Sequence, residues 1–256
     1  MMQRRDGETI AVIVSCEHAS RLVPKRFEDA FASARDALAT HRGSDIGALE
    51  LARRFAKDLD APLFATRVSR LLVDTNRSHT SKSLFSAWSR ELPAHERERI
   101  VEEHWRPHRE AVEGAVVSML ETADVVLHWS VHSFTPNLNG DERRADIGLL
   151  YDPSRTAERE FAGCYARILA AIDPALRIRK NYPYRGTSDG LTRHLRTRFA
   201  AGRYLGIELE VNQRFPLGQQ EPWVRLQRQL IGALRDSLET YRQHGLRAPA
   251  TTRRSR

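Results

Sequence analysis

The segment DVVLHWSV, residues 124–131, is followed directly by His132, and the fold prediction starts from it. It is a run of β-branched and apolar residues with the length of a buried strand, and it ends at a histidine. Two further segments have the same character: TIAVIVS, residues 9–15, and YLGIELEV, residues 204–211. These three runs predict the inner strands of one sheet.

Helical patterns alternate with these strands along the chain. The alternation predicts an α/β layered fold with a mixed, mainly parallel sheet. Pro107 is expected to break or kink the second helix, and Asp45 lies at or next to the N-cap of the first. The predicted helices are 46–59, 94–120, 157–171, 191–201 and 223–244, and further strands are predicted at 62–68, 70–74 and 146–151.

Length and composition fit one globular domain. The 256 residues are 41% hydrophobic, which is enough for a sizeable core, and we expect a single domain over 1–246 followed by a disordered basic tail, 247–256. No apolar run approaches the ~20 residues of a membrane span. The two cysteines, Cys16 and Cys164, form no disulfide or zinc-binding pattern, and the expected compartment is the cytoplasm.

The formal net charge of +8 raises the possibility of nucleic-acid binding. The positive charge is almost all arginine, and it is scattered among 33 acidic residues instead of forming a stripe with aromatic residues. We therefore favour a general bias towards arginine over a nucleic-acid site. The sequence does not indicate an oligomeric state.

Polar side chains follow several of the predicted strands. His18 follows the first strand, His132 the strand 124–131, and Asp74, Asn76 and Arg77 the strand 70–74. The carboxyl ends of strands build the ligand crevice in open α/β sheets. Their convergence predicts a functional site at that edge.

Two glutamates interrupt the last strand. Glu208 and Glu210 alternate with aliphatic residues, so both lie on one face of the strand. That face either is solvated at a sheet edge or lines a cleft in which one carboxylate acts as a general base. The sequence leaves both interpretations open.

His104 and His108 have the i, i+4 spacing of two zinc ligands on one helical face. The HExxH motif is absent, because Trp105 follows His104, and Pro107 disturbs the local geometry. Surface histidines flanked by charges are the interpretation that we favour.

Six motifs occur together and in order, and with them the chain resembles the N-formylglutamate amidohydrolase family over about residues 10 to 215. They are CEHAS at 16–20, HRGSD at 41–45, SRLLVDTNR at 69–77, SVHSFTP at 130–136, ADIGLLYDP at 145–153 and ELEVNQ at 208–213. The family is similar to zinc carboxypeptidases and aspartoacylase-type deacylases. The resemblance implies a three-layer α/β/α sandwich, one zinc ion (Zn2+) per chain, and hydrolysis of amide bonds next to a free carboxylate.

The resemblance also implies the metal ligands. His18 and His132 match the two histidine ligands, and the third ligand is Asp45, which we favour, or Glu17. Arg21 stands where related enzymes carry a ligating carboxylate. Ser130 stands where the family often has an aspartate, so a carboxylate that supports His132 is expected to be missing.

Further roles follow from the same match. Asn76 and Arg77 resemble a pair that binds the substrate carboxylate and polarises the scissile carbonyl. Glu210 matches the catalytic glutamate in one register and Glu208 in another; we favour Glu210 as general base. Two assignments rest on chemistry and not on the match. Arg70 is expected to assist Arg77 at the oxyanion, and a further arginine should hold the substrate's α-carboxylate with two parallel hydrogen bonds, Arg193 being the first candidate and Arg185 the second.

The predicted function is zinc-dependent hydrolysis of N-formyl-L-glutamate or a similar N-acyl amino acid. One alternative is an amidase or peptidase of the same fold acting on a different small amide. A second alternative is a non-catalytic basic binding module.

Overall fold

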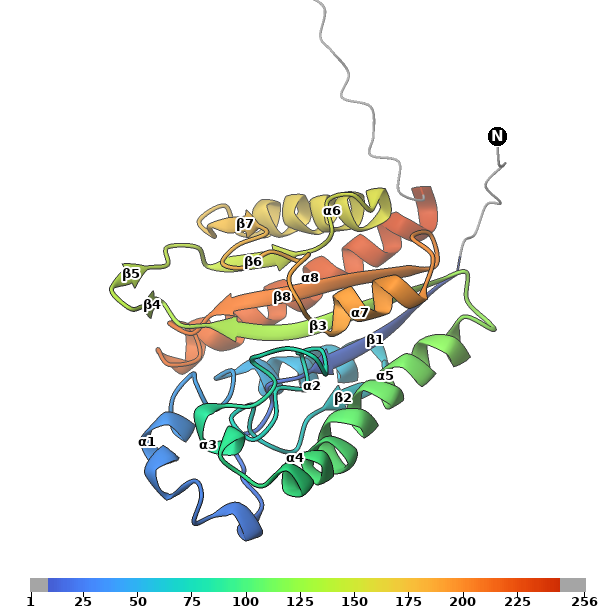
Figure 1. Cartoon of the computed structure of the whole chain (residues 1–256). Coiled ribbons are helices and arrows are strands. Elements are labelled where there is room, and N and C mark those ends of the chain that lie inside the picture. The colour runs from blue at the N-terminus through green and yellow to red at the C-terminus, as the bar shows by residue number, and fades with distance from the viewer. Residues whose placement is uncertain (1–8, 245–256) are drawn as a thin grey trace, which may run out of the picture.

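A six-stranded sheet forms the centre of the computed structural model, which describes residues 9–244 (Figure 1). The strand order is β2-β1-β3-β8-β6-β7, and neighbouring strands are parallel except β6 and β8. The predicted mixed, mainly parallel sheet is confirmed. The predicted basic tail, 247–256, lies outside the described residues. The strands are β1 (Ile10–Cys16), β2 (Leu63–Ala65), β3 (Val125–Phe134), β6 (Ile147–Leu150), β7 (Ile178–Lys180) and β8 (Tyr204–Asn212).

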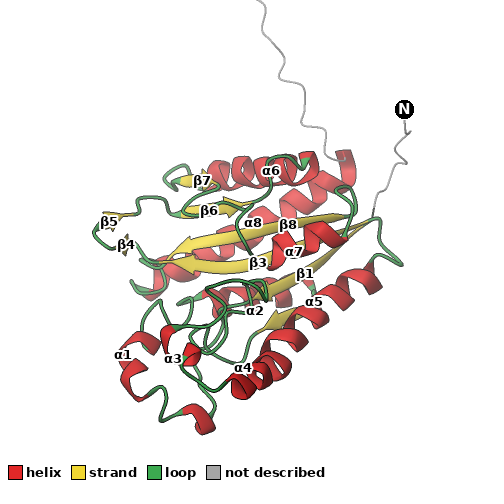
Figure 2. Ribbon diagram, viewed as in Figure 1, coloured by secondary structure: helices red, strands yellow, loops and turns green. Residues whose placement is uncertain are grey.

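Helices cover both faces of the sheet, so the three layers expected from the resemblance are present (Figures 1 and 2). Strand β3 is buried along its whole length. Its Trp129 packs edge-on against Phe55 and Tyr165 on one face, while Val126 belongs to the cluster on the other. The first face carries α2 (Ala48–Leu59), α6 (Thr156–Ile172) and α8 (Gln220–His244), and the second carries α5 (Arg106–Met119) and α7 (Leu191–Arg198).

A separate hydrophobic cluster forms beside the sheet and includes Phe27, Phe31 and Leu72. The predicted strand 70–74 is wrong, because Leu72 lies in a turn in which its amide donates to the carbonyl of Ser69 (2.9 Å). A short apolar run predicts burial, but its periodicity does not distinguish a strand from a buried turn. Short helices surround the cluster: Lys25–Phe27, Ala32–Ala34, α1 (Arg35–Leu38), α3 (Ala87–Arg90) and α4 (Ala94–Ile100).

The predicted helix 94–120 consists of α4, a π-helical turn (Val101–Trp105) and α5. Pro107 lies in the first turn of α5, where its missing amide hydrogen costs little, so the helical path continues through it. None of the helices in the described part of the chain is long and apolar enough to cross a membrane. A small antiparallel hairpin, β4 (Asn137–Leu138) and β5 (Asp141–Glu142), lies between β3 and β6.

The carboxyl ends of β1, β3 and β8 meet at one edge because these strands are parallel. In the register, His132 lies opposite Glu210, and Glu210 lies opposite Gly148 of β6. A Cβ atom added at Gly148 would overlap the carbonyl oxygen of Tyr182 and would lie 3.1 Å from Cβ of Glu210. Glycine at this position therefore allows the 181–190 loop to cross β6 beside Glu210.

Candidate metal centre

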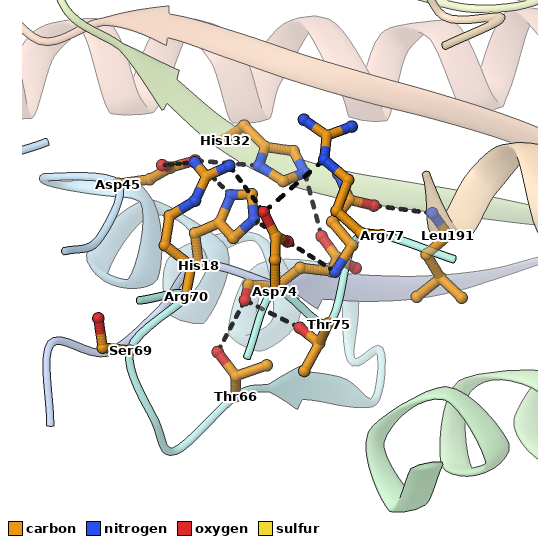
Figure 3. Close-up of polar contacts among 12 residues, drawn as sticks. His18, Asp45, Thr66, Ser69, Arg70, Asp74, Thr75, Arg77, His132 and Leu191 are labelled. Atoms are coloured by element: carbon orange, nitrogen blue, oxygen red, sulfur yellow. Dashed lines mark hydrogen bonds and ion pairs between the residues drawn. The ribbon is translucent and has the colours of Figure 1, made fainter. Parts of the chain in front are cut away.

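His18, Asp45 and His132 come together at this edge of the sheet (Figure 3). Nδ1 of His132 lies 2.9 Å from Oδ2 of Asp45, and Nδ1 of His18 lies 3.3 Å from the same oxygen. The amide of Asp45 donates to the carbonyl of His18 (2.9 Å), which fixes the loop before α2 against the end of β1. All three side chains are buried, and their ligand atoms lie within 4.8 Å of one another.

The second ring nitrogen of each histidine meets a different carboxylate. Nε2 of His18 lies 2.8 Å from Oδ1 of Asp74, and Nε2 of His132 lies 3.0 Å from Oε2 of Glu17. Histidines that bind metals in proteins almost always donate their other N–H group to such a partner. Two imidazoles and one carboxylate are a ligand set that fits a catalytic zinc ion, and a second carboxylate contacts the far nitrogen of each ring.

In the metal-free protein, the electrostatics of the cluster favour an ionised Asp45 and a protonated His132, whose proton a bound metal ion would displace. Burial acts to raise the pKa of the Asp45 carboxyl, but the two histidines outweigh burial and hold that pKa well below its usual range. Burial acts to lower the pKa of His132, while hydrogen bonds to Asp45 and Glu17 raise it well above its usual value. The cluster therefore attracts positive charge, as a cation site requires.

Glu17 faces away from the group of three. Its side chain contacts Nε2 of His132, whereas the Nδ1 atom of that histidine faces Asp45. The structure thus places Asp45, and not Glu17, with the two histidines. The carboxylate expected to be missing because of Ser130 is present and comes from the neighbouring strand end.

Two arginines border the cluster. Arg70 lies 2.9 Å from Asp74 and 3.5 Å from Asp45. Arg77 lies 3.8 Å from Asp74 and donates to the carbonyl of Asp189. Asn76 accepts at Oδ1 from the amide of Leu191 at the start of α7 (2.7 Å). These contacts hold both guanidinium groups and the amide beside the candidate metal site.

The two glutamates of β8 differ in their hydrogen bonding. Oε1 of Glu208 accepts from Oγ1 of Thr192 on α7. Oε2 of Glu210 is buried and has no hydrogen-bond partner within residues 9–244. Burial raises the pKa of Glu210 to about 8. A carboxyl with this pKa is mostly protonated at neutral pH in the metal-free protein, and a cation bound beside it would favour the carboxylate form that a general base needs.

A cavity of about 320 Å³ opens over the cluster. Arg185 lines it, but Arg193 does not: Arg193 lies in a separate cleft with Arg155 and Arg196. The cavity is lined by all the other predicted site residues except Glu17, which is buried behind His132, and Asp74, which contacts Nε2 of His18. Lining residues that the sequence analysis did not single out include His41, Ser133, Tyr184, Ser188 and Asp189.

His41 lies in the motif HRGSD and Ser133 in SVHSFTP. Their position in these motifs could have indicated that they belong to the site. Tyr184, Ser188 and Asp189 lie in the 181–190 loop, whose composition alone did not indicate which side chains face the cavity.

The fold and this cluster together define a class: an α/β protein with a candidate metal-dependent hydrolytic site at the carboxyl edge of its sheet. Comparison with family models identifies the family. Residues 10–215 match the model of the N-formylglutamate amidohydrolase family, and the chain belongs to this family. It is thus an amidohydrolase by family, and the resemblance stated from the motifs is confirmed. No curated protein matches the chain.

Two solved structures share the fold. A gene product of Agrobacterium tumefaciens is 27% identical with a TM-score of 0.76, and the match covers 91% of this chain and 92% of that one. An N-formylglutamate amidohydrolase from Ralstonia eutropha is 19% identical with a TM-score of 0.69, covering 93% and 96%. The second likeness supports the fold alone.

Proposed function

We propose that this chain is a zinc-dependent amidohydrolase that cleaves the amide bond of N-formyl-L-glutamate or of a similar N-acyl amino acid. The observation that carries the proposal is the orientation of His18 and His132. Nδ1 of each faces Asp45, and Nε2 of each meets a second carboxylate. The family description, N-formylglutamate amidohydrolase, supports the reaction and the substrate class.

Glu210 is the general base in this proposal. When bound, zinc supplies a water with a pKa lowered to about 7 and polarises a carbonyl oxygen. Glu210 lies beside His132 in the register and lines the cavity with an unpaired carboxyl oxygen. It accepts the proton of the attacking water and returns it to the leaving amine. Glu208 is already bonded to Thr192, so it serves this transfer less well.

Arg77 stabilises the negative charge that develops on the scissile carbonyl oxygen. The carbonyl of Asp189 already holds its guanidinium group, so little reorganisation is needed during the reaction. Arg70 supports it through the shared partner Asp74. Asn76, whose side-chain oxygen is occupied by Leu191, offers its amide hydrogens to the substrate.

The substrate carboxylate requires a cation that is not already paired. Arg70 lies within ion-pair distance of two aspartates, and Arg77 lies near one. Arg185 lines the same cavity and has no ion pair or side-chain hydrogen bond among residues 9–244. Its planar guanidinium group can donate two parallel hydrogen bonds to a carboxylate. We therefore assign the carboxylate to Arg185 in place of Arg193.

Replacing Arg185 with alanine is expected to raise KM about 10–100-fold with little change in kcat, the size of one charged hydrogen-bonded contact. Steady-state kinetics on the N-acyl amino acid and on its carboxamide analogue measure this effect. Arg193→Ala is the matched control and should leave both constants unchanged, because Arg193 lies in a separate cleft. Equal cleavage of both substrates by the wild type would show that no arginine recognises the carboxylate.

The function itself is tested on protein purified without chelator. Mass spectrometry should find one zinc per chain, and a screen of N-formyl and N-acyl amino acids, assayed for free amine, should give N-formyl-L-glutamate the highest kcat/KM. A zinc enzyme that prefers another amide would support the alternative of a different substrate. A protein without zinc or hydrolysis, but with salt-sensitive oligonucleotide binding, would support the binding module.

A further inference from the structure

Glu17 occupies an unusual position for a carboxylate that is not a metal ligand. It directly follows β1 and is 1% exposed. The hydroxyl groups of Thr66 and Thr75 both donate to its backbone carbonyl, at 2.9 and 3.1 Å. These two residues belong to different segments that follow β2. Two hydrogen bonds from different segments therefore fix the backbone at Glu17, independently of the contacts of its side chain.

The side chain of Glu17 reaches the back of His132. Oε2 accepts a hydrogen bond from Oγ of Ser130 (2.8 Å) and lies 3.0 Å from Nε2 of His132. The Ser130 hydroxyl also lies 2.9 Å from that nitrogen. These contacts fix the ring plane, and they direct Nδ1 of His132 towards Asp45.

His108 lies near the other carboxylate oxygen of Glu17, within ion-pair distance but beyond hydrogen-bond distance. The flanking charges predict a surface position for His108, and that prediction is wrong: its side chain is only 8% exposed, and its Nε2 lies 3.9 Å from Oε1 of Glu17. The π-helical turn Val101–Trp105 precedes His108 and contains more residues per turn than an α-helix, which changes the residues that face the sheet.

We infer that Glu17, which lies within ion-pair distance of His108, is the positioning residue that orients His132 for metal binding, and that the Ser130 hydroxyl links Glu17 to His132. The inference rests on the metal centre of the proposed function. A carboxylate on the far nitrogen of a ligating histidine fixes its tautomer and raises its basicity, and the loss of such a partner typically costs 10–100-fold in metal affinity.

The test is the zinc dissociation constant, measured by competition with a fluorescent chelator. Glu17→Gln is expected to raise it about 10–100-fold. Ser130→Asp, added to Glu17→Gln, should restore most of the affinity, since position 130 lies within hydrogen-bond distance of the same nitrogen. A role in packing alone would not be rescued by moving the carboxylate. The absorption spectrum of bound Co²⁺ reports the ligand geometry of each variant independently of activity.

Glu113→Gln is the matched control. Glu113 also forms ion pairs, with His194 and Arg198, but it does not line the cavity, so its replacement should leave zinc affinity unchanged. An unchanged dissociation constant in Glu17→Gln overturns the inference and leaves the metal centre standing. A wild type that binds no zinc overturns the proposed function instead. If Glu17→Gln does not fold, Ser130→Ala takes its place; it should weaken zinc binding about threefold or more, and no change would overturn the inference.

Discussion

Glu210→Gln is expected to lower kcat by at least about 10²-fold while zinc remains bound. Removing a general base typically costs 10²–10⁴-fold, and glutamine keeps the shape of the side chain without accepting the proton. The measurements are kcat on the best substrate and zinc content by mass spectrometry. Glu208→Gln is the matched control, because Glu208 shares the strand face but is bonded to Thr192. Near wild-type turnover in Glu210→Gln would transfer the role of base to Glu208.

The same substitution also has an expected effect on the stability of the zinc-free protein. Burial raises the pKa of Glu210 to about 8, so the folded state binds this proton more tightly than the unfolded state. The stability that the protonated carboxyl contributes is complete below the unfolded pKa of about 4.3, and it is lost as the pH rises towards 8. Glu210→Gln should therefore raise the melting temperature relative to wild type at about pH 8, and the advantage should shrink towards about pH 4. An equal difference at both pH values would contradict the raised pKa.

His132→Ala is expected to abolish stoichiometric zinc and, with it, activity. His132 is one of three ligand side chains, and we expect its loss to weaken binding at least about 10³-fold, more than the loss of a supporting carboxylate. Zinc content after dialysis against a weak chelator is the measurement. Because His132 is buried, circular dichroism must show that the variant folds.

A comparison of two carboxylates completes this test. Asp45→Asn should lose zinc as His132→Ala does, whereas Glu17→Gln should still load fully at excess zinc, because Glu17 contacts only the far nitrogen of the ring. If His132→Ala keeps one zinc per chain, the ligand assignment is wrong. If Glu17→Gln loses zinc entirely while Asp45→Asn retains it, the third ligand is Glu17.

Strands with continuous apolar runs could be predicted from the sequence because their whole surface is buried. β3 is the clearest case. β1 is buried at five of its seven residues, and β8 is buried along its whole length although Glu208 and Glu210 interrupt its apolar run. The error at 70–74 has a physical cause: Leu71, Leu72 and Val73 are as buried as strand residues, but they are buried in a turn against the separate cluster. The edge strand β7 has no apolar run that could indicate it, since Arg179 and Lys180 are exposed and only Ile178 is partly buried.

The candidate site could be predicted where motif and strand end coincide, as at His18, His132 and Glu210. The role of Glu17 could not, because it depends on the side-by-side register of β1 and β3, which brings residues more than a hundred positions apart into contact. Arg193 and Arg185 were equally suitable by chemistry. Only the path of the loop and of α7 separates them, with Arg185 at the cavity and Arg193 at another cleft.

Gly148 has a consequence for how this enzyme could acquire new specificities. The loop that carries Arg185 passes so close to β6 that any side chain at 148 would collide with the backbone of Tyr182 and crowd Glu210. We expect that exposed side chains of this loop can be exchanged to suit another substrate, whereas Asn181, which accepts from the amides of Tyr151 and Gly186, keeps the path of the loop. A change at 148 would instead displace substrate recognition and the base together. Adaptation at this site is therefore expected to proceed by exchanging loop side chains, while a library randomised at position 148 should yield almost only glycine among active clones.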